Sequence, residues 1–132
     1  MLTLKSVNHI AIIASDYARS LAFYTQVLGM EVLDEKFRTE RNSMMARLAL
    51  GGQYLVELFT FPGSPSRLTH PEACGLRHLA FEVADVEKCM AELDAMGVAH
   101  EPLRIAPNGE RVCFFHDPDG LPIELVENCV TV

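Results

Sequence analysis

An internal repeat is the feature that most constrains what this chain can fold into. The residues from His9 onward, HIAIIASDYARSLAFYTQVLGMEV, align with those from His78 onward, HLAFEVADVEKCMAELDAMGVAH, with one gap. Each copy opens with a histidine and an apolar run, continues through an aspartate into an amphipathic stretch, and reaches a glycine. A repeat of this kind predicts two modules of the same architecture.

Each module is expected to begin with a strand that leads into a helix. The stretch from about Tyr17 to Leu28 has apolar residues at helical spacing, and so has the stretch that begins at Val86 and reaches Met96. An aspartate precedes each stretch and a glycine follows it, as is typical of helix caps. These capping residues are Asp16, Gly29, Asp85 and Gly97.

Three more strand-like segments follow each helix. They are 30–38, 44–50 and 53–61 in the first copy, and 99–105, 111–117 and 122–127 in the second. The segment 62–75 is rich in Pro, Ser and Gly, which predicts a linker. The expected fold class is therefore α+β, with one βαβββ module at about 4–61 and a second at about 76–128.

Composition excludes several classes of partner. The chain has 132 residues and a formal charge of −7, which argues against nucleic-acid binding. We expect no membrane span, because no apolar run reaches the roughly 18 to 20 residues that a span needs, and we expect no signal peptide. The four cysteines form no C-x-x-C pair, so we expect reduced thiols and a cytoplasmic location.

One histidine and one glutamate recur at matched positions of the two copies. His9 and His78 open the first strands, while Glu57 in YLVELF and Glu124 in LPIELVE lie inside apolar strands. A carboxylate between apolar neighbours is costly unless it is paired or bound to a metal. A histidine of this kind, taken alone, is more often a hydrogen-bonded structural residue, but the matched recurrence favours a metal site. If a pseudo-twofold axis relates the copies, the four residues converge on one divalent ion: Zn²⁺, Ni²⁺, Mn²⁺, Co²⁺ or Fe²⁺.

At these residues the chain resembles the vicinal oxygen chelate superfamily, which includes glyoxalase I, methylmalonyl-CoA epimerase, fosfomycin-resistance proteins and extradiol dioxygenases. The resemblance rests on NHIAI, SLAFYTQVLGMEV, YLVELF, GLRHLAFEV and FFHDPDGLPIELVE. It is strongest to small bacterial glyoxalase-like proteins. It implies a single domain over residues 1–132, with paired βαβββ modules that form an open, cup-shaped mixed sheet around one divalent metal. It also implies the ligands, which are His9, Glu57, His78 and Glu124.

The resemblance further implies a lyase or isomerase that moves a proton on a small substrate whose adjacent oxygens the metal chelates. Glu124 is expected to act as the base, and Glu57 as a ligand and second proton carrier. A homodimer is expected, because the open sheets need a partner. Glyoxalase I enzymes typically grip glutathione with an arginine and an asparagine where this chain has Ile13 and Phe61, and with a glycine-and-lysine loop where it has APNGER. Glutathione-dependent activity is therefore not expected.

Two other functional classes stay open. An Fe²⁺ dioxygenase of this fold uses two histidines and one carboxylate, so the fourth candidate ligand argues against it. A non-enzymatic binding or resistance protein would lack the four ligands. Several arginines are candidates for contact with an anionic substrate, although Arg77 is expected to face away from His78. These arginines are Arg38, Arg41, Arg47, Arg77 and Arg111.

Overall fold

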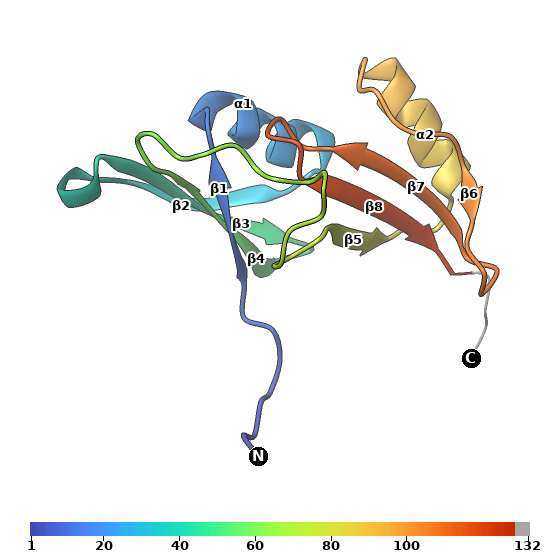
Figure 1. Cartoon of the computed structure of the whole chain (residues 1–132), viewed down its shortest axis with the longest axis horizontal. Coiled ribbons are helices and arrows are strands. Elements are labelled where there is room, and N and C mark those ends of the chain that lie inside the picture. The colour runs from blue at the N-terminus through green and yellow to red at the C-terminus, as the bar shows by residue number, and fades with distance from the viewer. Residues whose placement is uncertain (129–132) are drawn as a thin grey trace. The chain divides into compact units, whose positions relative to one another are not determined.

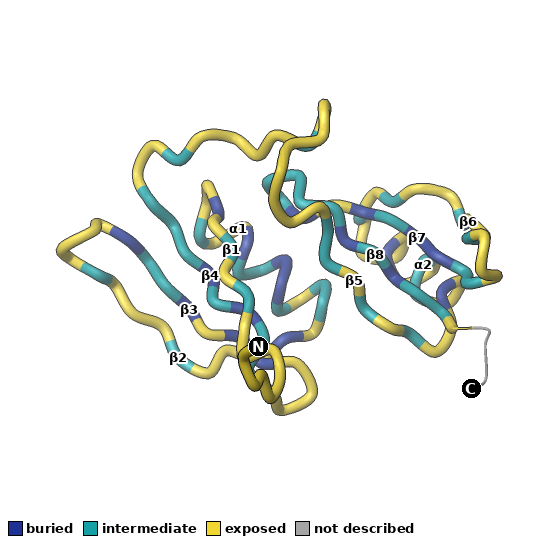
Figure 2. The backbone as a smooth tube through the Cα atoms, turned by 60° about the horizontal axis from the view of Figure 1, so that its bottom comes forward, coloured by how far each residue is buried: buried dark blue, intermediate teal, exposed yellow. Residues whose placement is uncertain are grey.

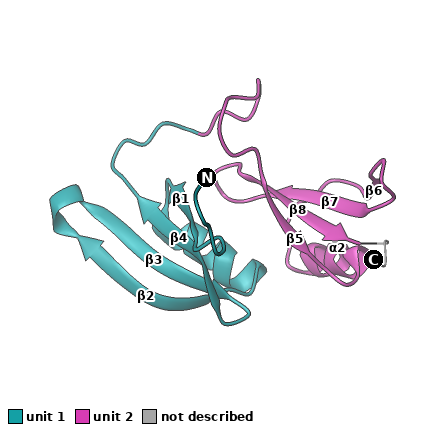
Figure 3. Cartoon of the chain, turned by 90° about the horizontal axis from the view of Figure 1, so that it is seen from below, with its two compact units in different colours: residues 1–66 teal, residues 67–132 magenta. Residues whose placement is uncertain are grey.

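The structure is a computed structural model that describes residues 1–128. The chain divides into two compact units, residues 1–66 (unit 1) and residues 67–132 (unit 2), as Figure 3 shows. Each unit contains a strand, a helical segment and three further strands in that order. The predicted α+β class and the two βαβββ modules are confirmed.

Unit 1 is one four-stranded mixed sheet with a helix on one face (Figure 1). Its elements are β1 (Ile10–Ala14), α1 (Tyr17–Ala22), the π-helical turn η1 (Phe23–Val27), β2 (Glu31–Arg38), the 3₁₀ turn η2 (Thr39–Arg41), β3 (Ser43–Leu50) and β4 (Gln53–Thr60). The strand order is β1-β4-β3-β2. β1 runs parallel to β4, while the other pairs are antiparallel.

Unit 2 repeats this arrangement. Its elements are β5 (Leu79–Glu82), α2 (Val86–Ala95), β6 (Arg104–Ile105), β7 (Arg111–His116) and β8 (Pro122–Glu127). The strand order is β5-β8-β7-β6, and β5 is parallel to β8. No helix within residues 1–128 has the length and apolar character needed to cross a membrane.

The helix caps form as the sequence predicts. The Asp16 carboxylate accepts from the backbone N–H of Arg19, and the Asp85 carboxylate accepts from that of Lys88, each at 3.0 Å. Gly29 follows the first helical segment at φ +74°, and Gly97 follows the second at φ +73°. That left-handed conformation strains residues with a side chain, so the glycines let the chain turn out of each helix.

The first helix differs from the prediction in one respect, because its α-helical part ends at Ala22 and a π-helical turn follows. The hydroxyl of Thr25 donates to the carbonyl of Leu21 at 2.7 Å. Beyond this point the backbone ladder widens, with the N–H of Leu28 donating to the carbonyl of Phe23. A side chain that bonds back to a carbonyl competes with the regular ladder, which accounts for the change.

Replacing Asp85 with alanine should lower the free energy of unfolding by about 1 kcal/mol, because the first turn of α2 loses its cap. Urea unfolding followed by circular dichroism measures this. The control is Glu92→Ala, an exposed position on the same helix without a cap. An equal loss of stability in both variants would contradict the capping role.

Buried residues alternate with less buried ones along β4 and β8, which indicates that each sheet has one buried face. Figure 2 shows the burial of each residue along the backbone. In unit 1 Leu48, Val56 and Leu58 are fully buried, and α1 packs against β4. In unit 2 Phe115 and Ile123 are buried, and α2 packs against β7 and β8. Apolar side chains thus hold each helix to its sheet and leave the opposite face for other chemistry.

The predicted strand at 99–105 is mostly wrong. Only Arg104–Ile105 forms strand β6, while His100 makes an isolated bridge to Phe115. Pro102 lies between these two contacts and has no N–H to donate to a ladder, which interrupts the strand.

Candidate metal centre

His9 and Glu57 lie together on unit 1. His9 immediately precedes β1, and Glu57 lies on β4 opposite Ala11, whose small side chain leaves room beside the carboxylate. The Nε2 atom of His9 is 3.8 Å from Oε1 of Glu57. The Nδ1 atom of His9 lies 2.7 Å from the amide oxygen of Asn8. Because that oxygen only accepts, Nδ1 is the donor in this contact, and Nε2 is the ring atom that faces the glutamate.

His78 and Glu124 form the matching pair on unit 2. His78 immediately precedes β5, and Glu124 lies on β8 opposite Ala80. The Nε2 atom of His78 is 3.8 Å from Oε2 of Glu124, the same separation as in unit 1. The Nδ1 atom of His78 is buried, and no described residue hydrogen-bonds to it.

The two pairs fit the expected metal by their donor chemistry. The separation of 3.8 Å is too long for a hydrogen bond and a few tenths of an ångström longer than the roughly 3.0 to 3.5 Å between two donors about 2.1 Å from one ion, so each pair would close slightly around a bound metal. Two imidazole nitrogens and two carboxylates suit a first-row divalent ion. Within residues 1–128 no three His, Cys, Asp or Glu side chains form a group that could hold a metal, so the ligand candidates occur as pairs. That all four meet at one ion stays a prediction.

Each histidine is backed by an aromatic ring and an arginine. In unit 1 the His9 ring stacks on Tyr54 at 4.9 Å between centroids, and the Arg47 guanidinium lies 5.6 Å from the Tyr54 centroid. Burial, followed by the neighbouring Glu57 carboxylate, raises the pKa of Tyr54. This phenol therefore stays protonated at neutral pH and adds no negative charge beside the ligand pair.

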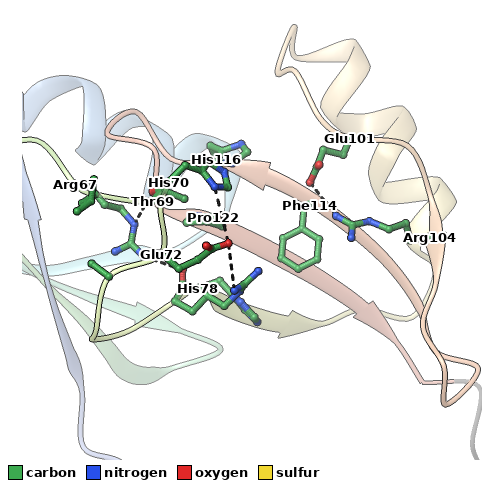
Figure 4. Close-up of a pocket in the computed structure, with 13 residues that line it drawn as sticks. Arg67, Thr69, His70, Glu72, His78, Glu101, Arg104, Phe114, His116 and Pro122 are labelled. Carbon is green, nitrogen blue, oxygen red and sulfur yellow. Dashed lines mark hydrogen bonds and ion pairs between the residues drawn. The ribbon is translucent and has the colours of Figure 1, made fainter.

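A pocket of about 390 Å³ opens beside His78 and is lined entirely by unit 2 (Figure 4). One wall is fixed by Arg67, which donates to the carbonyls of Leu76 and Arg77 at 2.7 and 2.8 Å and to the hydroxyl of Thr69 at 3.2 Å. These bonds tie the linker to the residues just before His78, so Arg67 helps to position the candidate ligand. The sequence offered no signal for this role.

The predicted orientation of Arg77 is wrong. Both Arg77 and His78 line the pocket, whereas strand alternation had placed them on opposite faces. The reason is that β5 begins at Leu79, so both residues precede the regular strand and need not alternate. Arg77 instead lies 3.8 Å from the Glu72 carboxylate.

The other candidate arginines contact residues of their own unit. Arg47 donates through Nε to both carboxylate oxygens of Asp34, at 2.8 and 3.0 Å. Arg111 lies 2.7 Å from Glu87 and 3.8 Å from Glu127. Arg38 and Arg41 lie over the rings of Phe59 and Phe61, at 5.7 and 4.8 Å from the centroids.

Asp94, His100 and Cys113 lie in a row that looks like a nucleophilic triad but lacks a reactive thiol. His100 Nε2 is 2.8 Å from the Asp94 carboxylate, and His100 Nδ1 is 3.8 Å from the Cys113 sulfur. The cysteine is 1% exposed, and burial raises the pKa of its thiol. Because the thiolate is the nucleophile, this cluster is structural. Cys113, Cys89 and the exposed Cys74 are free thiols, and Cys129 lies outside the described residues.

The His100 cluster predicts a pH-dependent stability. The Glu101 carbonyl, followed by the Asp94 carboxylate, raises the pKa of His100 above its unfolded value. Protonated His100 therefore stabilises the fold fully below the unfolded pKa, and this contribution is lost as pH rises through the folded pKa. We expect His100→Gln to destabilise the protein more at pH 5.5 than at pH 8.5 in urea unfolding. An equal loss at both pH values would contradict the assignment.

The sequence model of the Glyoxalase/Bleomycin resistance protein/Dioxygenase superfamily matches residues 6–125. The chain therefore belongs to this superfamily. It is 53% identical to the uncharacterized protein YwkD of Bacillus subtilis, over 94% of this chain and 98% of that protein. It is also 53% identical to the uncharacterized protein YaeR of Escherichia coli, over 96% of this chain and 99% of that protein. A glyoxalase family protein from Enterococcus faecalis has a similar crystal structure, with a TM-score of 0.87, 47% identity, and coverage of 93% and 98%.

More distant relatives have assigned activities. A protein from Vibrio cholerae described as a probable lactoylglutathione lyase is 31% identical, over 92% of this chain and 90% of its own length. The trypanothione-dependent glyoxalase I of Leishmania major is 31% identical with a TM-score of 0.72, over 94% of this chain and 87% of that one. The fosfomycin resistance protein FosX of Listeria monocytogenes, crystallised with Mn(II), shares the fold at 20% identity and a TM-score of 0.74, over 94% and 93%.

Proposed function

We propose that this protein is a metal-dependent lyase or isomerase that binds adjacent oxygens of a small substrate and moves a proton. The observation that carries the proposal is the repeated His–Glu pair, with 3.8 Å between Nε2 and the carboxylate in each unit. The proposed metal ligands are His9, Glu57, His78 and Glu124. The lyase relatives support the class of reaction, and the Mn(II) in FosX supports the use of this fold for a divalent ion.

In the proposed reaction the metal ion stabilises negative charge, and side chains of the protein transfer the proton. A bound divalent cation stabilises the negative charge that forms on a carbonyl oxygen when the neighbouring carbon loses a proton. Glu124 takes that proton through its carboxylate, and Glu57 is the second group that returns or carries it. Their side chains are about one-fifth exposed, so water has limited access to both carboxylates.

Glutathione is not the proposed co-substrate. Ile13 is 54% exposed, and Phe61 stacks on Phe59 at 5.5 Å beneath Arg41. Neither Ile13 nor Phe61 offers the polar grip that glyoxalase I enzymes use for the peptide at these positions. We propose that the substrate is a 2-oxo aldehyde, a thiohemiacetal of another thiol, or an acyl thioester.

The test begins with metal content. Protein purified without chelators should contain about one transition-metal ion per chain by mass spectrometry, since four ligands supply one site. The loaded protein should exchange the carbon-bound proton of a substrate from this panel with solvent deuterium, followed by NMR. If no metal is found and none binds on adding Zn²⁺, Ni²⁺ or Mn²⁺, the catalytic proposal falls and a sequestering role takes its place.

We also propose a homodimer in the cytoplasm. No helix of its own unit covers the sheet face with His9 and Glu57, and exposed apolar residues such as Ile13 lie on the same strand as Ala11. Sedimentation velocity measures the dimer directly, and a monomer at micromolar concentration would contradict it.

A further inference from the structure

The Arg104 guanidinium in the unit 2 pocket lies over an aromatic ring that contacts His78. The guanidinium carbon of Arg104 lies 5.1 Å from the centroid of the Phe114 ring. Phe114 meets the His78 ring edge to face, with 5.4 Å between centroids. Figure 4 shows Arg104 beside Phe114 at the pocket. A positive charge is therefore held one aromatic ring away from a candidate metal ligand.

A comparison with unit 1 shows that Arg104 has weaker carboxylate contacts than Arg47. Arg47 also lies over an aromatic ring next to a histidine, since Tyr54 stacks on His9, but the Asp34 carboxylate accepts two contacts from the Arg47 Nε, at 2.8 and 3.0 Å. Among the described residues, the carboxylate partner of Arg104 is Glu101, with one contact of 3.4 Å. That distance exceeds the roughly 2.7 to 2.9 Å of a strong charge-assisted bond, so the Arg104 fork keeps donors for a ligand.

The other two arginines of the pocket are engaged elsewhere. Arg67 donates to backbone carbonyls, and Arg77 pairs with Glu72. The lining thus combines three arginines with two glutamates, together with the hydroxyl of Thr69 and the imidazole of His116. A pocket of about 390 Å³ is at the lower end for small-molecule sites. It suits a compact ligand with a negative group at one end.

We propose that this pocket binds an anionic group of the substrate, a carboxylate or a phosphate, and that Arg104 selects it. The planar guanidinium donates two parallel bonds to such an oxyanion, and Phe114 holds its plane. The inference rests on the proposed function, because the group that reacts must lie at the His78 side of the same pocket. It narrows the substrate class to small molecules that carry a carboxylate or phosphate group in addition to the two oxygens that the metal chelates.

Three related molecules test the proposal by calorimetry with Mn²⁺-loaded protein. Lactate, malate and 3-phosphoglycerate share a 2-hydroxycarboxylate that a metal chelates, and they differ in having a methyl, a carboxylate or a phosphate at the far end. We expect malate or 3-phosphoglycerate to bind about tenfold more tightly than lactate, and the tighter of the two identifies the anion. Arg104→Gln should remove this preference and leave the affinities for lactate and Mn²⁺ unchanged.

Two further variants test whether Arg104 itself gives the anion preference or whether any positive charge in the pocket would. Arg77→Gln removes a positive charge from the same pocket but should keep the preference, because Arg77 is paired with Glu72. Arg104→Lys should keep more of the preference than Arg104→Gln does, because lysine keeps the positive charge but lacks the two parallel donors of the guanidinium. No preference in the wild type, or a preference that survives Arg104→Gln, would overturn the proposal.

A metal-free arm distinguishes failure of this inference from failure of the proposed function. Inorganic phosphate or acetate should shift the amide NMR signals of Glu101, Leu103 and Arg104 in the wild type and not in Arg104→Gln. If Mn²⁺ fails to bind while these shifts occur, the metal enzyme proposal fails and the anion site stands. If neither phosphate nor acetate causes such shifts, the anion site is rejected whatever the metal does.

Discussion

Replacing His78 with alanine should reduce metal affinity by more than about 100-fold. Changes to residues that merely support a metal ligand cost about 10- to 100-fold, and loss of a ligand should cost at least as much. His9→Ala should have a similar effect, because the repeat gives His9 the same position relative to Glu57 as His78 has relative to Glu124. Metal content by mass spectrometry and competition with a chromogenic chelator measure both variants.

The matched control is His116→Ala. His116 lines the same pocket as His78 but forms no ion pair with a glutamate in the described part of the chain, so its loss should leave metal affinity unchanged. Circular dichroism of each variant checks that the fold survives. If His78→Ala binds no metal while His9→Ala still binds it with wild-type affinity, the four-ligand site is wrong and unit 2 alone holds the ion.

The repeat predicted the backbone around the candidate ligands because similar sequences form similar caps, strands and strand pairs in the two modules. The aspartate and glycine caps fix where each helix begins and ends, and strand alternation fixes which face each side chain takes. The register then places Glu57 opposite Ala11 and Glu124 opposite Ala80. Equivalent positions in the two copies therefore became equivalent positions in the two sheets.

The pocket residues whose contacts the sequence did not predict lie outside the long helices and strands. Arg67 lies in the linker and acts through hydrogen bonds to carbonyls, which no spacing pattern reveals. Arg104 lies in a two-residue strand after Pro102, so alternation predicts nothing about its direction. The repeat itself did not help, because Arg47, which lies over the Tyr54 ring as Arg104 lies over the Phe114 ring, comes from a different strand of its module. Side chains placed by tertiary contacts need the structure.

Glu124→Gln should remove most of the turnover while the protein stays folded and binds metal. A general base contributes about 10²- to 10⁴-fold to rate, and the amide of glutamine cannot take the proton. Its carbonyl oxygen still offers a ligand atom of the same size at the same place on β8. We expect deuterium exchange at the substrate carbon to fall by about that factor at saturating metal, as measured by NMR.

Glu57→Gln is the matched comparison, because the two glutamates differ in role but share their environment. Each carboxylate oxygen lies 3.8 Å from Nε2 of its histidine, and each side chain is about one-fifth exposed. If Glu124 is the base and Glu57 a ligand and second proton carrier, Glu57→Gln should lower exchange less than Glu124→Gln. A larger loss in Glu57→Gln would exchange the two roles, and an active Glu124→Gln would remove Glu124 from the chemistry. Metal affinity is measured in both variants, because a loss of exchange that comes from weaker metal binding would otherwise be attributed to the loss of the base.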